Sequence, residues 1–115
     1  MKTSLQQWQG WDILSIEGIF VLRELHLARH AFEYFEERSG AKVALNLSKT
    51  KLLDSSAITL LMNLQKRLKD ESGMLVILEP CDEIKSIFSV LEIENSIPVF
   101  YTRAEFESAV LEGAL

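Results

Sequence analysis

Three residues with oxygen-bearing side chains, Asp54, Ser55 and Ser56, stand together in the middle of the chain. They follow an apolar run and a short polar loop, and they precede a segment with helical periodicity. A phosphate is stabilised at a helix N-terminus, where unpaired backbone N–H groups and the positive end of the helix dipole point outward. Asp and Ser are also preferred helix caps. The spacing therefore leaves open both a plain capped helix and a phosphorylation site.

Phosphorylation would change the charge of this turn. A phosphate on Ser56 would add about −1.5 to −2 charges at neutral pH. The start of a helix would tolerate that charge, whereas a partner presenting an apolar surface or a carboxylate would not. Asp54 makes the turn more acidic, and Lys49 and Lys51 offset part of this charge. A phosphate here would therefore act on binding, whereas the spacing alone favours plain helix capping.

The same serines do not fit the nucleophile of a hydrolase. Glycines flank the serine of a nucleophile elbow, but here Asp54 and Ala57 flank the pair. Both histidines come before the central strand, whereas such a hydrolase brings its histidine late in the chain. The five glycines are scattered, so no glycine-rich phosphate loop is present. We therefore expect a protein that is not an enzyme.

A pair of histidines raises the question of a metal site. His26 and His30 are four residues apart, a spacing that allows two histidines of one helix to share a metal ion, and Glu33 and Glu37 lie on the same face. The glutamate that follows the first histidine of a zinc-protease helix is absent. Because any amphipathic helix presents such a polar face to solvent, we expect neither a metal nor a cofactor.

Composition predicts one globular domain spanning residues 1–115. Hydrophobic residues make up 48% and charged residues 25% of the chain, which are ordinary values. The net charge of −5 argues against a nucleic-acid binder, which normally has a basic face. The sequence contains neither a recognisable signal peptide nor a membrane span, and no basic amphipathic segment would bind a membrane directly. We expect a cytoplasmic protein in which the single Cys81 is a small packed side chain beside a helix.

The N-terminal part of the chain predicts a hairpin and a helix. Two alternating apolar segments between residues 5 and 16 are separated at Gln9 and Gly10, which indicates a tight turn. Gly18 is expected to end the second strand, and Ser39 and Gly40 to end the helix that follows. The buried stripe of that helix is expected to consist of Leu25, Ala28, Phe32 and Phe35.

Apolar runs at residues 42–47 and 74–78 predict two interior strands. A loop over 48–54 and a helix over about 55–69 are expected between them. After Pro80, Asp82 is expected to cap a third helix. The apolar stripe of this third helix is Ile84, Ile87, Phe88 and Leu91.

A short strand over 97–101, with Pro98 at its start or on an edge, and a helix capped by Thr102 and Glu105 complete the order. Strands that alternate with long helices indicate right-handed crossovers and a parallel sheet. The expected fold is α/β, with a mixed, mainly parallel sheet, an N-terminal hairpin and about four α-helices.

The helix over 55–69 has two apolar residues beside its core stripe. The centre of the stripe is expected to be Ala57, Leu61, Leu64 and Leu68. Ile58 and Met62 fall on one flank, while Ser56 lies on the polar side. If Ile58 and Met62 are partly exposed, they form a semi-apolar surface beside the serines that a partner protein could bind. Packing of both residues against a neighbouring helix is the alternative.

From about residue 11 to residue 110 the chain resembles the STAS domain family, and within it the bacterial anti-sigma factor antagonists. The family signature is an apolar strand, a short loop and D-S-S/T-G-x-x-x-L-L, which stands here as LNLSKTKLLDSSAITLLMNL. Ala57 replaces the usual glycine, and Val21 stands where many relatives have an acidic residue. Gly18, Gly73, the I-x-x-I-F-x-x-L pattern and the closing VFYTRAEFESAV also match.

The resemblance implies a phosphorylation-switched interaction module. Its partners would be a GHKL-type protein that is both serine kinase and anti-sigma factor, together with a phosphatase, and only the form with unphosphorylated Ser56 would bind the anti-sigma factor. The alternative is a STAS subunit of a stressosome-like particle or of a transporter-associated assembly. The expected partner-binding residues are Asp54, Ser55, Ser56, Ala57, Ile58 and Met62.

Overall fold

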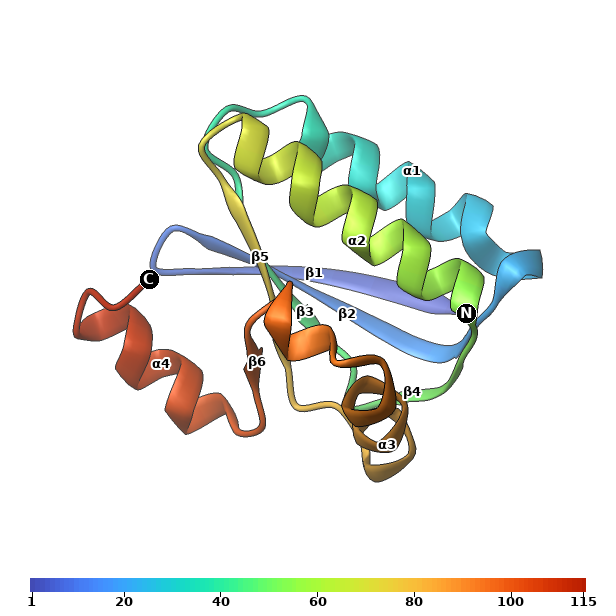
Figure 1. Ribbon diagram of the computed structural model, residues 1–115. Helices are drawn as coiled ribbons and strands as arrows, with labels where there is room; N and C mark the ends of the chain where they lie inside the picture. Colours follow the sequence, from blue (N-terminus) through green and yellow to red (C-terminus); the bar gives the residue numbers. More distant parts are fainter.

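The computed structural model describes residues 1–115, and a six-stranded sheet lies at its centre (Figure 1). The strands are β1 (Lys2–Trp8), β2 (Trp11–Phe20), β3 (Lys42–Asn46), β4 (Thr50–Leu53), β5 (Met74–Leu78) and β6 (Val99–Phe100). The helices are α1 (Leu25–Glu36), α2 (Ser55–Asp70), α3 (Asp82–Leu91) and α4 (Arg103–Leu111), with short 3₁₀ turns η1 (Leu22–Glu24) and η2 (Ile93–Asn95). The strand order is β1-β2-β3-β5-β6, and β4 also pairs with β2.

The expected hairpin and the mainly parallel sheet are confirmed. β1 and β2 are antiparallel, while every other pair is parallel. Gln9 and Gly10 form the turn with φ values of 49° and 80°, the two positive values that a type I′ turn requires. Glycine accepts this conformation without strain, which is why the chain reverses at this point. The four α-helices are also as expected.

Two expectations around β4 are wrong. Gly18 does not end the second strand, because β2 continues to Phe20 through an irregularity in register at Gly18, where φ is 101°. Residues 48–54 are not only a loop, because β4 pairs with β2 beyond the end of its pairing with β3. The buried Thr50 side chain fixes this arrangement by donating a hydrogen bond from Oγ1 to the Ile16 carbonyl at 2.7 Å.

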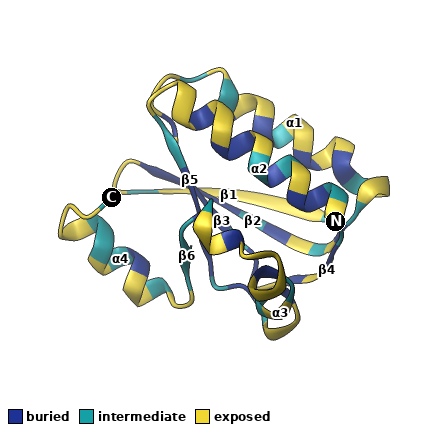
Figure 2. Ribbon diagram, viewed as in Figure 1, coloured by how far each residue is buried: buried dark blue, intermediate teal, exposed yellow.

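Helices cover both faces of the sheet (Figures 1 and 2). α1, α2 and α3 pack on one face and form the larger hydrophobic cluster, whereas α4 packs on the other face and forms a smaller one. The alternation along β2 decides which side chain enters which cluster, since Leu14 and Ile16 join the larger cluster and Trp11 and Ile13 the smaller. The predicted stripe of α1 is confirmed, because its four residues are the buried residues of that helix.

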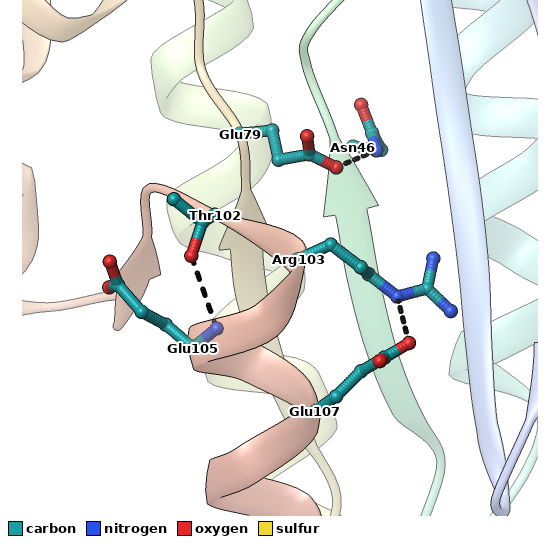
Figure 3. Close-up of polar contacts among 6 residues, drawn as sticks. All are labelled: Asn46, Glu79, Thr102, Arg103, Glu105 and Glu107. Carbon is teal, nitrogen blue, oxygen red and sulfur yellow. Dashed lines mark hydrogen bonds and ion pairs between the residues drawn. The ribbon is translucent and has the colours of Figure 1, made fainter.

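The last two helices begin in different ways. Asp82 was expected to cap α3, but Cys81 occupies the N-cap position, and Asp82 is an exposed first-turn residue that makes no capping bond. α4 begins at the predicted cap, since Thr102 Oγ1 accepts a hydrogen bond from the Glu105 N–H at 3.1 Å, but no bond from the Glu105 side chain completes the capping box (Figure 3). In the first two turns of α4, Arg103 pairs with Glu107 at 3.0 Å. Of the stripe predicted for α3, Ile84 and Phe88 are buried, Ile87 is half-buried and Leu91 is exposed.

A buried glutamine extends the hydrogen bonding at the β6 side of the sheet. β6 pairs with β5 only at Ile77 and Leu78, so Leu75 lies beyond its reach. Gln65 of α2 replaces the missing strand there, since its Oε1 accepts from the Leu75 N–H at 2.7 Å and its Nε2 donates to the Leu75 carbonyl at 3.0 Å. The same Nε2 donates to the Ser96 carbonyl at 3.3 Å. At the other end of β5, the Asn46 Nδ2 donates a hydrogen bond to the Glu79 Oε1 at 3.2 Å (Figure 3).

No helix of the structure combines the length and the apolar character needed to cross a membrane.

Candidate functional site at the start of helix α2

The serine turn connects β4 to α2, and Asp54 organises it. Asp54 has an extended backbone, as an N-cap residue should, and its Oδ1 accepts a hydrogen bond from the Ala57 N–H at 3.0 Å. The same oxygen accepts the hydroxyl of Ser56 at 2.5 Å. Ser55 and Ser56 are therefore the first two residues of the helix, and the cap is the aspartate.

Asp54 also connects this turn to a distant part of the chain. Its second oxygen, Oδ2, accepts a hydrogen bond from the Leu22 N–H of η1 at 3.0 Å. The hydroxyl of Ser56, first, and then the Leu22 N–H lower the pKa of the Asp54 carboxyl, because both donors stabilise its charged form. The turn thus presents an ionised carboxylate bonded to three donors, one of which is the hydroxyl of Ser56.

The structure places the predicted site residues on two sides of α2. Ser55 is exposed, and Ser56 is half-buried with its hydroxyl bonded to Asp54. Ala57 is fully buried and has no positive φ, so the turn forms without the glycine usual in the family. Ile58 is only 9% exposed and belongs to the larger cluster, so at this position the structure shows the alternative of core packing. Met62 is half-buried and packs against that cluster.

The exposed apolar side chains beside the turn come from residues that the sequence did not single out. Leu22, held by Asp54, is 69% exposed, and Leu52 and Ile19 are 52% and 37% exposed. Ile19 of β2 and Leu52 of β4 are register partners, so their side chains lie on the same side of the sheet extension. We call Ile19, Leu22, Leu52, Ser55 and Ser56 the serine-turn surface. The exposed apolar residue Leu52 could have indicated it, had β4 been recognised as a strand.

The other residues considered for chemistry lie elsewhere. His26, His30, Glu33 and Glu37 are all exposed on α1, which confirms the predicted polar face. No group of three or more His, Cys, Asp or Glu side chains converges in a way that could hold a metal ion. Cys81 is half-buried and its Sγ donates to the Thr50 carbonyl at 3.1 Å, so it helps to join α3 to β4.

Comparison with known proteins identifies the family. The STAS domain model matches residues 9–106, and the chain belongs to the STAS domain family. No curated protein matches this sequence in a direct comparison. The family is defined in this chain by the mixed sheet, by its helices and by the serine turn at the start of α2.

Solved structures share the fold at low sequence identity. A candidate anti-sigma factor antagonist of Thermotoga maritima is 18% identical, with a TM-score of 0.85 over 94% of this chain and 93% of its own. An anti-sigma factor antagonist from Mycobacterium paratuberculosis is 16% identical, with a TM-score of 0.84 over 95% and 92%. The Bacillus cell fate determinant SpoIIAA in its phosphorylated form is 14% identical, with a TM-score of 0.70 over 95% and 99%.

Proposed function

We propose that this protein is an anti-sigma factor antagonist of the cytoplasm, whose binding to an anti-sigma factor is switched by phosphorylation of Ser56. The observation that carries the proposal is the serine-turn surface, where the half-buried Ser56 lies at a helix N-terminus beside exposed apolar side chains. Structural relatives described as anti-sigma factor antagonists support it, and one of them, SpoIIAA, has also been solved in its phosphorylated form. The protein acts by binding and catalyses no reaction.

In the unphosphorylated form the hydroxyl of Ser56 is neutral and satisfied by Asp54. The Asp54 carboxylate already has three hydrogen-bond donors, so a partner can cover Ile19, Leu22 and Leu52 without leaving this carboxylate unsatisfied, and the covered apolar area favours binding. The Leu22 main chain is already held by Asp54, so this part of the surface is ordered before the partner arrives.

A phosphate on Ser56 changes this balance against binding. It removes the proton that Ser56 donates to Asp54, and it places about −1.5 to −2 charges beside an ionised carboxylate. The first-turn N–H groups of α2 stabilise the phosphate, so the domain itself stays folded. The partner, however, would have to strip water from the dianion, and that cost exceeds the gain from covering a few apolar side chains. Binding is therefore lost while the fold is kept.

The direct test uses phosphorylation. The protein is incubated with ATP and each GHKL-type serine kinase encoded in its source genome, and the modified residue is located by mass spectrometry. We expect phosphate on Ser56, no phosphate on a Ser56→Ala variant, and normal phosphorylation of the matched Ser55→Ala variant. Modification at Ser55 or elsewhere, with Ser56 untouched, would refute the assignment.

Binding is tested separately with the same kinases as immobilised partners. A Ser56→Asp variant should bind at least about tenfold more weakly than wild type, because a fixed charge at this position must be desolvated. Equal binding by Ser56→Asp and wild type would contradict the switch. Copurification from native cells distinguishes the alternative, since a stressosome-like particle or a transporter, in place of a sigma-factor regulator, would then be recovered with the protein.

A further inference from the structure

The two edges of the sheet are protected to very different degrees. Edge strands expose unpaired N–H and C=O groups, and monomeric proteins usually shield them with short length, proline, charges, bulges or a covering element. The β6 edge is shielded, since β6 has two residues and follows Pro98. The β1 edge has none of these devices except Lys2. It is seven residues long, pairs with β2 in an unbroken register, and is exposed from Lys2 to Gln7 (Figure 2).

The hairpin geometry shows which backbone groups of β1 are free. In a hairpin closed by a two-residue turn, the residues that flank the turn exchange hydrogen bonds, and bonded and non-bonded pairs then alternate. Trp8 and Trp11 flank the turn at Gln9 and Gly10. The even-numbered residues of β1 therefore bond to β2. The N–H and C=O groups of Thr3, Leu5 and Gln7 point away from the sheet, into solvent.

We propose that a second copy of this chain occupies the β1 edge, with the two β1 strands pairing antiparallel about a two-fold axis at Leu5. This register pairs all seven residues of the strand, placing Thr3 opposite the partner's Gln7 and Leu5 opposite the partner's Leu5. The six outward backbone groups of each copy are then satisfied by those of the other. The two sheets become one continuous sheet, and an isologous interface of this kind is self-complementary.

The side chains of β1 suit this occupant. Leu5 is 45% exposed although its register partner Leu14 is buried, so the core side of the edge carries an apolar residue that its own helices leave uncovered. In the dimer it would contact the partner's Leu5. Lys2 is the only charged residue of the strand. In this register each Lys2 lies opposite the partner's Trp8, and the two lysines are at opposite ends of the paired strands. No like charges therefore face one another, despite the net charge of −5 on each copy.

Hydrogen exchange on the wild-type protein provides the first test. At low concentration the amides of Thr3, Leu5 and Gln7 should exchange rapidly while those of Ser4 and Gln6 are protected. At high concentration the three odd-numbered amides should become protected as well, in step with the appearance of dimer in sedimentation equilibrium. A monomer that persists to millimolar concentration, or exchange of the three amides that does not depend on concentration, overturns the proposal.

Two variants of Leu5 with opposite charges test the position of the two-fold axis. Leu5→Lys and Leu5→Glu each place like charges opposite one another at the two-fold axis, and each should raise the dimer dissociation constant at least about tenfold. An equimolar mixture should form a heterodimer, detected by native mass spectrometry with one variant isotopically labelled. Leu91→Lys, at an exposed leucine of α3, is the matched control and should dimerise like wild type. Variants that dimerise unchanged, or a mixture that stays monomeric, refute the register. None of these outcomes depends on the phosphorylation of Ser56, so the dimer and the phosphorylation switch are tested separately.

Discussion

At the scale of single residues, Asp54 has three simultaneous contacts, with the backbone of its own helix, with Ser56 and with η1. The capping contact follows from residue type, because Asp is a preferred N-cap. The bond to Leu22 spans 32 positions in the chain, and no local pattern signals it. The serines were correctly placed at the helix start from sequence, whereas Leu22 was found only through this long-range contact, and Ile19 and Leu52 through the pairing of β2 with β4.

Replacing Asp54 should therefore cost more than loss of an ordinary cap. Asp54→Ala removes a cap bond worth about 1 kcal/mol and leaves the Leu22 N–H without its partner, so we expect a loss of about 1.5 to 3 kcal/mol in the free energy of unfolding measured with urea. Asp82→Ala is the control, because Asp82 makes no capping bond, and it should change stability by less than about 0.5 kcal/mol. Equal effects of the two variants would contradict the role of Asp54.

The titration of Asp54 gives a second prediction at this scale. Its pKa in the folded state lies below the ordinary value of 3.8, and the hydroxyl of Ser56 is the main cause. A lowered folded pKa stabilises the fold above the unfolded pKa, and this contribution is lost as the pH falls through the folded pKa. By NMR titration, Ser56→Ala should raise the pKa of Asp54 toward 3.8, while Ser55→Ala should leave it unchanged. An Asp54 pKa that does not respond to Ser56→Ala would disprove the hydrogen bond.

At the scale of elements, periodicity predicted the long helices and the buried strands β3 and β5, because each shows a clear pattern over its whole length. It failed at β4, whose four residues are too few to be distinguished from a loop and do not alternate in burial. It also failed at Gly18, which introduces an irregularity inside β2 without ending it. The helical wheel left open whether Ile58 is exposed or packed, because a wheel describes one helix and contains no neighbour. Tertiary packing decides such positions.

The side chain of Gln65 in α2 completes the backbone hydrogen bonding of strand β5. Gln65→Leu fits the space but removes the bonds to both backbone groups of Leu75, so two buried polar groups lose their partners. We expect a loss of about 2 to 4 kcal/mol in urea unfolding, together with faster hydrogen exchange of the Leu75 amide. Asn63→Leu, at an exposed position on the same helix, should be nearly neutral. A neutral Gln65→Leu would mean that water or rearranged backbone satisfies β5.

At the scale of the whole molecule, the alternation of strands and helices predicted the fold class, because it leaves few ways to cover a parallel sheet. The unequal division of the core was not visible in the sequence. The larger cluster joins three helices, whereas the smaller cluster depends on α4, from which only Phe106 is fully buried. The α4 face is therefore the part of the domain with the fewest apolar contacts holding its helix.

Removing Phe106 should release α4 before the rest of the domain. Phe106→Ala deletes the ring that packs on Trp11 with centroids 5.1 Å apart, and we expect a loss of about 3 to 5 kcal/mol in stability. Hydrogen exchange should accelerate first in α4 and only later in α1 and α2. The exposed neighbour Glu105→Ala is the control for local helix propensity. Uniform acceleration across all helices would show that the domain opens only as a whole.

The position of the aromatic residues has an optical consequence. Both tryptophans, Trp8 and Trp11, contact Phe106 in the smaller cluster, with ring centroids 5.7 Å and 5.1 Å away, and the larger cluster contains no tryptophan. Indole emission therefore reports the docking of α4 and says little about the face that carries α1, α2 and the serine turn. When α4 detaches early, fluorescence and circular dichroism will record two different midpoints for the same sample.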